Sequence, residues 1–251
     1  MGTQVKPDRR TKRFAVAMVI VAGLIASAFA ASAASLGGIN SADLSAWSDT
    51  VTISVPPVFL ASDSFTGCTS TLDGWVDSVG NPWTSHEGDW QCLAGDVARN
   101  HKRFSVGHAS VDIGVYDNIS VSTDITRIST QKGKSGAGLA LFSDGTYFIS
   151  VIYKRDQDRL VLGVNAPSGF RELMEVDPIS DLDSGTLTVQ IQQPILTVLI
   201  NGSVVMTFDL TDTAYLSAEE QDLLLENTRF GLASDNDNWS RYADFTIVAL
   251  P

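Results

Sequence analysis

Two carboxylates stand close together at Glu175-Val-Asp177, where they could carry acid–base chemistry on a sugar. Alternate residues of an extended strand point to the same side, so this spacing would aim both groups into one groove. Hydrolysis of a glycosidic bond needs such a pair, one group to protonate the leaving oxygen and one to attack the sugar or activate water. Pro178 follows at once, and because proline cannot donate to a strand ladder, the strand is predicted to end there.

Four aspartates are candidates for holding a calcium ion (Ca2+), which prefers several carboxylate and carbonyl oxygens. Asp63 and Asp244 lie near the first and last predicted strands of the folded part. Asp235 and Asp237 belong to an acidic loop that begins like an EF-hand loop but has Trp239 at its fifth position and no glycine after it. The alternative is that these residues stabilise turns by bonding their own backbone.

Five aromatic residues are candidates for flat platforms that a ligand could stack on: Trp83, Trp90, Trp239, Tyr147 and Tyr153. Trp239 is the best placed to be exposed, because it stands in a polar loop. The alternative for each ring is packing in a core, since aromatic residues are large hydrophobic groups that fill the interior of β-sandwiches.

Other catalytic motifs are missing from the sequence, which has no G-x-S-x-G elbow, no H-E-x-x-H pair and no phosphate-binding loop. His86, His101 and His108 fall in one region without metal-ligand spacing. We interpret them as surface or loop-stabilising residues, and the alternative is that one of them lines a groove.

The first part of the chain has the pattern of an export signal. Five basic residues precede an uncharged run from Phe14 to Leu36, and Ala31-Ser32-Ala33 resembles a cleavage site, so residues 1–33 are predicted to direct export. The alternative is a retained membrane anchor, because the run exceeds the ~20 residues that cross a bilayer. An extracellular or cell-surface location follows from either. Residues 34–60, rich in Ser, Ala and Pro, are predicted to form a linker.

The charge of the predicted exported part excludes some classes of partner, and its cysteine content indicates a disulfide. Residues 1–33 hold five Lys/Arg and one acid, which leaves 12 basic and 28 acidic residues, a net charge of −16. Such a surface repels nucleic acid and anionic membranes, so membrane contact is expected only through residues 1–33 if they are uncleaved. Cys68 and Cys92 are an even pair in an exported chain, which favours one disulfide.

The elements that must position these residues are strands. Between Thr186 and Leu210 apolar and polar residues alternate, which is the pattern of half-buried strands. Gln193-Pro194 interrupts the run, and Asn201-Gly202 predicts a type I′ hairpin turn, so we expect a three-stranded meander with Val204, Met206 and Phe208 on its apolar face.

Strand patterns recur from Asp63 to the end of the chain. Alternation or apolar runs predict further strands at 109–115, 119–128, 138–142, 147–153, 160–164, 170–176, 230–233 and 245–250. One short helix is predicted after the capping box Ser217-Ala-Glu-Glu220. The expected fold class is all-β, an antiparallel two-sheet sandwich with one short helix in a single domain at 61–251, preceded by an N-terminal signal or transmembrane helix.

Several pieces resemble the concanavalin A-like lectin/glucanase jelly roll, which includes laminin-G-like modules. They include Leu72-Asp-Gly-Trp75, Glu87-Gly-Asp-Trp90, Ala137 to Phe142, the 186–210 meander and Phe230-Gly-Leu-Ala233. The resemblance covers nearly all of residues 62–250. It implies two curved sheets, a concave face that can hold sugar and frequently a bound calcium. Separately, Ser32 to Ala46 resembles the leader-proximal segment of actinobacterial surface proteins that carry a biofilm-matrix type of signal.

The preferred functional hypothesis is a non-catalytic module for carbohydrate binding or adhesion, with a glycan or another cell-envelope component as partner. The first alternative is a glycoside hydrolase or lyase of the same superfamily. Its glucanases carry Glu-x-Asp-x-x-Glu on one strand, and Glu175-Val-Asp177 lacks the last glutamate, so Glu172 and Glu175 are interpreted as a solvated edge. The second alternative is a structural envelope or matrix protein, because one fold serves many functions.

Overall fold

The computed structural model describes residues 56–93, 96–100, 106–127, 136–154, 158–177, 184–235 and 240–251. The predicted signal or anchor at 1–33 and most of the predicted linker lie outside the described residues. Residues 56–251 form one compact unit. Its first described strand is β1 (Val58–Asp63), and Leu60, at the end of the predicted linker, is a buried core residue. In the described part of the chain no helix combines the length and apolar character needed to cross a bilayer.

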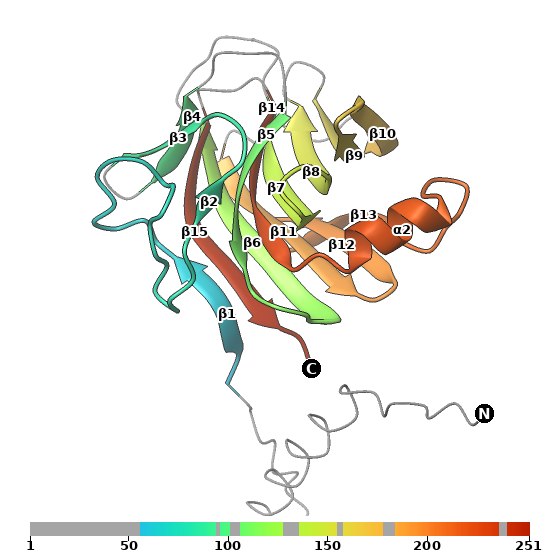
Figure 1. Ribbon diagram of the computed structural model, residues 1–251, viewed down its shortest axis with the longest axis horizontal. Coiled ribbons are helices and arrows are strands. Elements are labelled where there is room, and N and C mark those ends of the chain that lie inside the picture. The colour runs from blue at the N-terminus through green and yellow to red at the C-terminus, as the bar shows by residue number, and fades with distance from the viewer. Residues whose placement is uncertain are drawn as a thin grey trace, which may run out of the picture. The chain divides into compact units, whose positions relative to one another are not determined.

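One sheet contains the strands on which the predicted meander lies (Figure 1). Besides β1, its members are β3 (Asp89–Cys92), β4 (Val97–Asn100), β6 (Asn118–Arg127), the meander strands β11 (Ser184–Gln192), β12 (Ile195–Ile200) and β13 (Ser203–Asp209), and β15 (Ser240–Ala249). The order is β13-β12-β11-β6-β15-β4-β3, and β1 pairs with β15, which makes eight strands.

The second sheet has seven strands, in the order β10-β9-β8-β7-β14-β5-β2. Their bounds are β2 (Thr84–Ser85), β5 (Val106–Asp112), β7 (Gly136–Ser143), β8 (Phe148–Lys154), β9 (Arg159–Ala166), β10 (Gly169–Val176) and β14 (Arg229–Asp235). The pairings given above are antiparallel in both sheets, which confirms the all-β, two-sheet sandwich expected from the sequence. Apolar side chains of the two sheets meet in one large core.

The meander formed as predicted, except at one residue. Asn201 and Gly202 have φ values of 50° and 78°, and Ile200 pairs with Ser203 across this two-residue turn. The register between β12 and β13 shifts between Val198 and Leu199. Because such an irregularity reverses the side of the sheet to which neighbours point, Val204 is 62% exposed instead of joining the apolar face.

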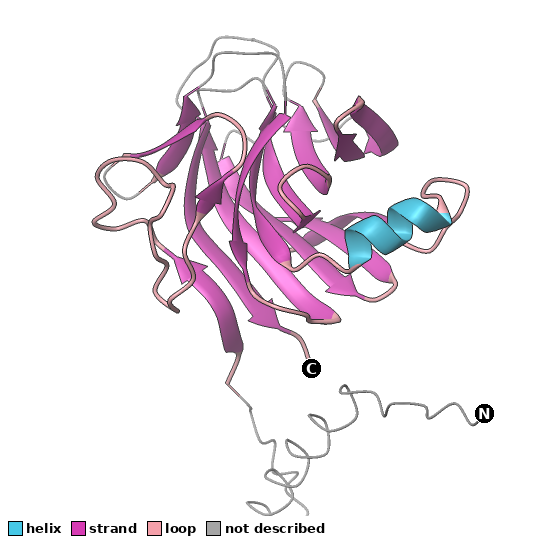
Figure 2. Ribbon diagram, viewed as in Figure 1, coloured by secondary structure: helices cyan, strands magenta, loops and turns pink. Residues whose placement is uncertain are grey.

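Helix α2 (Ala218–Leu225) joins β13 to β14 and therefore connects the two sheets (cyan in Figure 2). Ser217 is its N-cap, and the reciprocal bonds of the predicted capping box with Glu220 are both present. Arg171 of β10 forms an ion pair with Glu220 and donates a hydrogen bond to the Tyr215 carbonyl at 2.7 Å, which ties the edge of the seven-stranded sheet to the helix.

The two sheets differ in how their strands are buried. Along β11 and β12, buried residues alternate with partly exposed ones, as expected for strands with one face in the core. All eight residues of β7 are buried, and so are six of the seven residues of β8. The outer side of β7 and β8 is therefore shielded from solvent as well, whereas the edge strand β10 is largely exposed.

Candidate functional site

The outer face of the seven-stranded sheet carries small and polar residues together with the aromatic rings of Phe148 and Phe170. Side chains that alternate with the core residues belong to this face, and they include Ser110, Gly138, Ala140, Ser150, Gly163 and Ala233. Ala140, Phe148, Ile152 and Ala233 form a hydrophobic cluster separate from the main core, with Val106 packed against it. Phe148 and Val106 of this second cluster form the floor of the candidate site.

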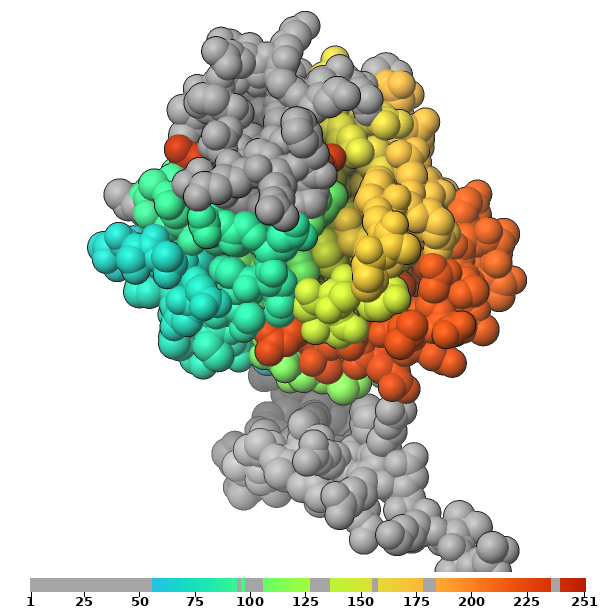
Figure 3. Space-filling model, turned by 45° about the horizontal axis from the view of Figure 1, so that its top comes forward, coloured from blue at the N-terminus to red at the C-terminus, as the bar shows by residue number. Residues whose placement is uncertain are grey.

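A cavity of about 260 Å³ opens above this floor. Its lining comes from segments far apart in the sequence: Glu87, Thr146, Phe148, Asn165, Phe170 and Asp235 all contribute. In Figure 3 the green part of the chain with β2 and β5 lies beside the yellow part with β8 to β10, and residues of both parts line the cavity. A hollow lined by apolar rings and a few polar groups is the usual form of a small-ligand site.

Phe170 gives the cavity an accessible aromatic ring, with 37% of the residue exposed. The ring lies against Gly163, where a Cβ atom would stand 2.3 Å from it, so only glycine allows this position. The Lys154 ammonium lies 5.0 Å from the ring centroid and 3.4 Å from an Asp235 carboxylate oxygen. Cation, ring and carboxylate thus hold one another in place at the cavity wall.

Asn165 is the best buried polar group of the lining, with 7% of the residue exposed. Its Nδ2 donates a hydrogen bond to Ser150 Oγ at 2.8 Å. An amide carries a second N–H and an acceptor oxygen, so Asn165 is oriented by the protein and keeps capacity for a ligand.

His86 and His108 stack on one another beside the cavity, with ring centroids 4.4 Å apart. The centroid of the His108 ring lies 3.9 Å from the centroid of the Phe148 ring, and Phe148 lines the cavity. Burial, and then the charge of Arg229, lowers the pKa of His86 below its usual value. The nearby serines, Ser110 on His86 and Ser143 on His108, are themselves buried, so they do not present nucleophiles to a substrate.

Three of the predicted sugar platforms belong to the core instead of the surface. Trp83 and Trp90 are each 1% exposed, and so is Tyr153. Their rings pack against other core residues, Trp83 on Phe245 and Trp90 on Tyr242. The Gly- and Asp-rich stretch around the two tryptophans suggested an exposed loop, so the prediction of exposure was wrong. The residues that bury these rings, Phe245 and Tyr242, lie on a strand that is distant in the chain.

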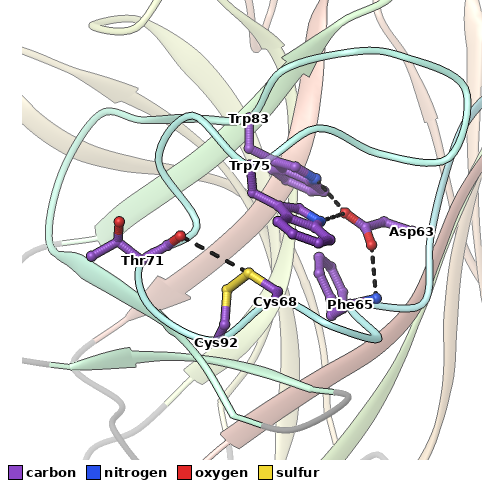
Figure 4. The surroundings of a disulfide bond; sticks show 7 residues. All are labelled: Asp63, Phe65, Cys68, Thr71, Trp75, Trp83 and Cys92. Atoms are coloured by element: carbon purple, nitrogen blue, oxygen red, sulfur yellow. Dashed lines mark hydrogen bonds between the residues drawn. A yellow bond between two sulfur atoms is a disulfide. The ribbon is translucent and has the colours of Figure 1, made fainter.

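Asp63 explains how Trp83 is held (Figure 4). One carboxylate oxygen accepts the indole N–H groups of Trp75 at 3.0 Å and of Trp83 at 2.8 Å. The other accepts the backbone N–H of Phe65 at 2.7 Å. Burial raises the pKa of Asp63, against the lowering effect of these donors. Asp63 is therefore an acceptor for three N–H groups, which is a structural role.

The predicted calcium ligands are not brought together among the described residues. The N–H groups that point at Asp63 occupy both oxygens, and Asp235 is paired with Lys154 in the other sheet. Asp244 is exposed in the middle of β15, next to Phe245, which pairs with Asp63 but itself points into the core. The described residues contain no group of three or more side chains of the types that bind metals. The described carboxylates therefore do not fit a calcium site, and Asp237 lies outside the described residues.

The remaining predictions have mixed outcomes. The disulfide between Cys68 and Cys92 is present, as predicted. Tyr147 is partly buried and packs against the core, and Trp239 lies outside the described residues. Glu175 is on β10, an edge strand, and forms an ion pair with Arg159.

The residues of the cavity were not identified from the sequence. Phe148, Asn165 and Phe170 lie on three neighbouring strands, and cross-strand pairing places both Phe148 and Phe170 opposite Asn165. One signal was present: Ser150 and Asn165 interrupt apolar strands at positions that share a face. Polar residues inside strands that are buried on both faces indicate a site on the outer face.

Comparisons with known proteins identify the fold. No protein-family model matches the sequence, and no curated protein matches it. The structure is similar to the carbohydrate-binding module CBM66 from Bacillus subtilis, with a TM-score of 0.54 and 12% identity over 73% of this chain and 98% of that one.

Two enzyme-related structures are similar to the same degree. One is reported with the endo-acting O-glycanases that prominent members of the human gut microbiota express to initiate mucin breakdown, with a TM-score of 0.54 and 11% identity over 77% of this chain and all of that one. The other is the GH43 protein BlXynB from Bacillus licheniformis, with a TM-score of 0.53 and 12% identity over 79% of this chain and 41% of that one. These likenesses agree with the lectin/glucanase-like sandwich expected from the sequence, and at such identities they show the fold alone.

Proposed function

We propose that this protein binds a carbohydrate in the cavity on the outer face of the seven-stranded sheet. The observation that carries the proposal is the exposed Phe170 ring beside the oriented amide of Asn165 and the carboxylate of Asp235. The apolar C–H face of a sugar stacks on an aromatic ring, while its hydroxyls bond to amide and carboxylate groups. Similar folds in a carbohydrate-binding module and in proteins linked to glycan breakdown support this proposal.

The charge of the cavity favours a glycan without acidic groups. Glu87 and Asp235 are the charged residues of its lining, and both are carboxylates. Lys154 compensates Asp235, and the whole chain has a net charge of −12. A sulfated or uronic acid-containing glycan would be repelled, so a neutral glycan is the ligand class that fits.

The proposed setting is the cell surface or the exterior, where a cell-envelope glycan would be within reach. This part of the proposal depends on the basic and apolar pattern of residues 1–33. A retained anchor would keep the module at the membrane, whereas cleavage would release it.

The test is a screen of the full-length chain against neutral and acidic glycans, followed by calorimetric titration of the best ligand. F170A is expected to lose about tenfold or more in affinity, because the ring face is lost, and N165A is expected to weaken binding through the lost amide. F59A is the matched control, since Phe59 is a 48% exposed phenylalanine on β1 of the other sheet. Equal affinity of F170A and the parent chain would overturn the proposal.

A second candidate function is glycoside hydrolysis, because two carboxylates line the same cavity. Glu87 and Asp235 enter it from different segments, and a pair of carboxylates is what such hydrolysis requires. Release of new reducing ends from a bound glycan, abolished by both E87Q and D235N, would establish this activity. Binding without any release over long incubation would leave the protein as a binding module.

A further inference from the structure

The stacked histidines link the cavity to a titratable group, the imidazole of His86. His86 stacks on His108 with an angle of 20° between the rings, and His108 contacts Phe148. Glu87, the residue after His86, lines the same cavity as Phe148. A change at His86 therefore reaches the cavity by two short routes, one through the stacked rings and one through the backbone.

The two rings are fixed in place from several elements. His86 Nε2 and Ser110 Oγ are 2.8 Å apart, and His108 Nε2 and Ser143 Oγ are 2.7 Å apart. The backbone N–H of Gly145 donates to the same Ser143 oxygen at 2.9 Å. A Cβ atom on Gly145 would lie 2.8 Å from His86 Nδ1, so the turn between β7 and β8 closes tightly on the ring.

The charges around His86 come from three different segments. Arg229 of β14 disfavours a proton on the ring, whereas Asp73 and Asp144 favour one. Burial has the largest effect and, with Arg229, lowers the pKa of the imidazole below its usual value. The lowered pKa favours the neutral ring of His86 at pH 7, and the ring takes a proton only below the usual histidine value of about 6.5.

We propose that protonation of His86 weakens the stack on His108 and thereby lowers the affinity of the cavity for its ligand. This inference rests on the proposed function of the cavity. An imidazolium in a desolvated stack lacks solvation, so the charged ring is drawn towards Asp73 and Asp144. His108 then loses its packing partner, and Phe148 loses the support of His108 at the cavity floor. Binding is tight at neutral pH and the ligand is released on acidification.

The first experiment measures the affinity of the full-length chain for its best glycan from about pH 7.5 to about pH 5. The parent chain is expected to lose about tenfold for each pH unit below the pKa of His86 until the ligand-bound form also takes the proton. H86F keeps a stacking ring but takes no proton, so its affinity is expected to be independent of pH in this range. A parallel loss in H86F and the parent chain would overturn the proposal.

The second experiment needs no ligand, and it separates this inference from the proposed function. Titration of the histidine Cε1–H resonances by NMR is expected to show His86 taking a proton while the signals of His108 and Phe148 move with the same midpoint. If no glycan binds at any pH, the proposed function fails, and this titration alone decides whether the stack responds to protonation. Unmoved His108 and Phe148 signals would overturn the switch. Where a glycan does bind, saturation with it should lower the His86 pKa by the same coupling.

Discussion

Two regions of this protein place aromatic rings beside a carboxylate, and the same residue types have different roles in them. Around Asp63, both carboxylate oxygens accept N–H groups of the protein itself, and the Trp83 ring is buried. In the cavity, the Phe170 ring is accessible, and the Asn165 amide has one bond to Ser150 and further capacity. The first region holds the fold together, whereas the second can hold a ligand.

The difference teaches how to tell a structural cluster from a binding site. Aromatic and acidic residues at close spacing do not decide the matter. What decides it is whether the hydrogen-bonding capacity is already used within the protein and whether a ring face reaches a cavity. Variants in the two regions should therefore separate stability from binding.

The largest effect is expected for D63A. The indole N–H groups of Trp75 and Trp83 would lose their acceptor, and the buried one would remain unpaired, which costs about 3 kcal/mol of unfolding free energy. Chemical denaturation measures this loss, and glycan affinity of the folded fraction should be unchanged. D222A, which alters an exposed aspartate of α2, is the control and should change stability by less than about 0.5 kcal/mol. A D63A protein with the same unfolding free energy as the parent would contradict the structural role assigned to Asp63.

Removal of the aromatic ring of the cavity should give the reverse result. F170A is expected to lower glycan affinity about tenfold or more while the denaturation midpoint stays close to that of the parent, because the residue is 37% exposed. F170Y keeps the ring face and should retain most of the affinity. Calorimetry and denaturation on the same preparations would show whether the two properties separate. An F170A protein that unfolds as readily as D63A would contradict the comparison.

A smaller effect is expected on stability in mildly acidic solution. The folded pKa of His86 is lowered by burial, so the unfolded chain binds a proton more readily than the folded one. The stabilising contribution of neutral His86 is therefore present above the usual histidine pKa of about 6.5 and is lost as the pH falls through the folded value. Denaturation midpoints should decrease over this range in the parent chain and decrease less in H86F. Identical slopes would assign the pH dependence to other groups.

Removal of divalent cations is expected to have the smallest effect. The described carboxylates of both regions already have partners within the protein, N–H donors at Asp63 and Lys154 at Asp235. Melting temperature and glycan affinity should therefore be the same in EDTA and in added calcium. A drop in either value in EDTA, restored by calcium, would show that the residues outside the described part complete a cation site.

Local features of the fold could be predicted from the sequence because short-range chemistry determines them. The Asn201-Gly202 turn needs only two residues that accept positive φ, and the helix start at Ser217 needs only its capping box. The outward position of Val204 could not be predicted, since it follows from a register irregularity between two strands.

The candidate site could not be predicted from such local sequence patterns. Phe148, Asn165 and Asp235 meet only because four strands pair in a particular order and register. Trp83 failed as a prediction for the same reason, since its partner Asp63 lies on a strand that precedes it by twenty residues. Both errors concern which distant residues share a face, and hydrophobic periodicity alone does not contain that information.

The pairing of β15 has a consequence for how the protein is made. This strand is the last one among the described residues, yet it pairs with β1, β4 and β6. The eight-stranded sheet cannot be completed until residues 240–249 have been synthesised. Until then β1, β4 and β6 lack a pairing partner along one edge. A chain that stops before Ser240 would lack this strand, so β1, β4 and β6 would keep unpaired edges that favour aggregation.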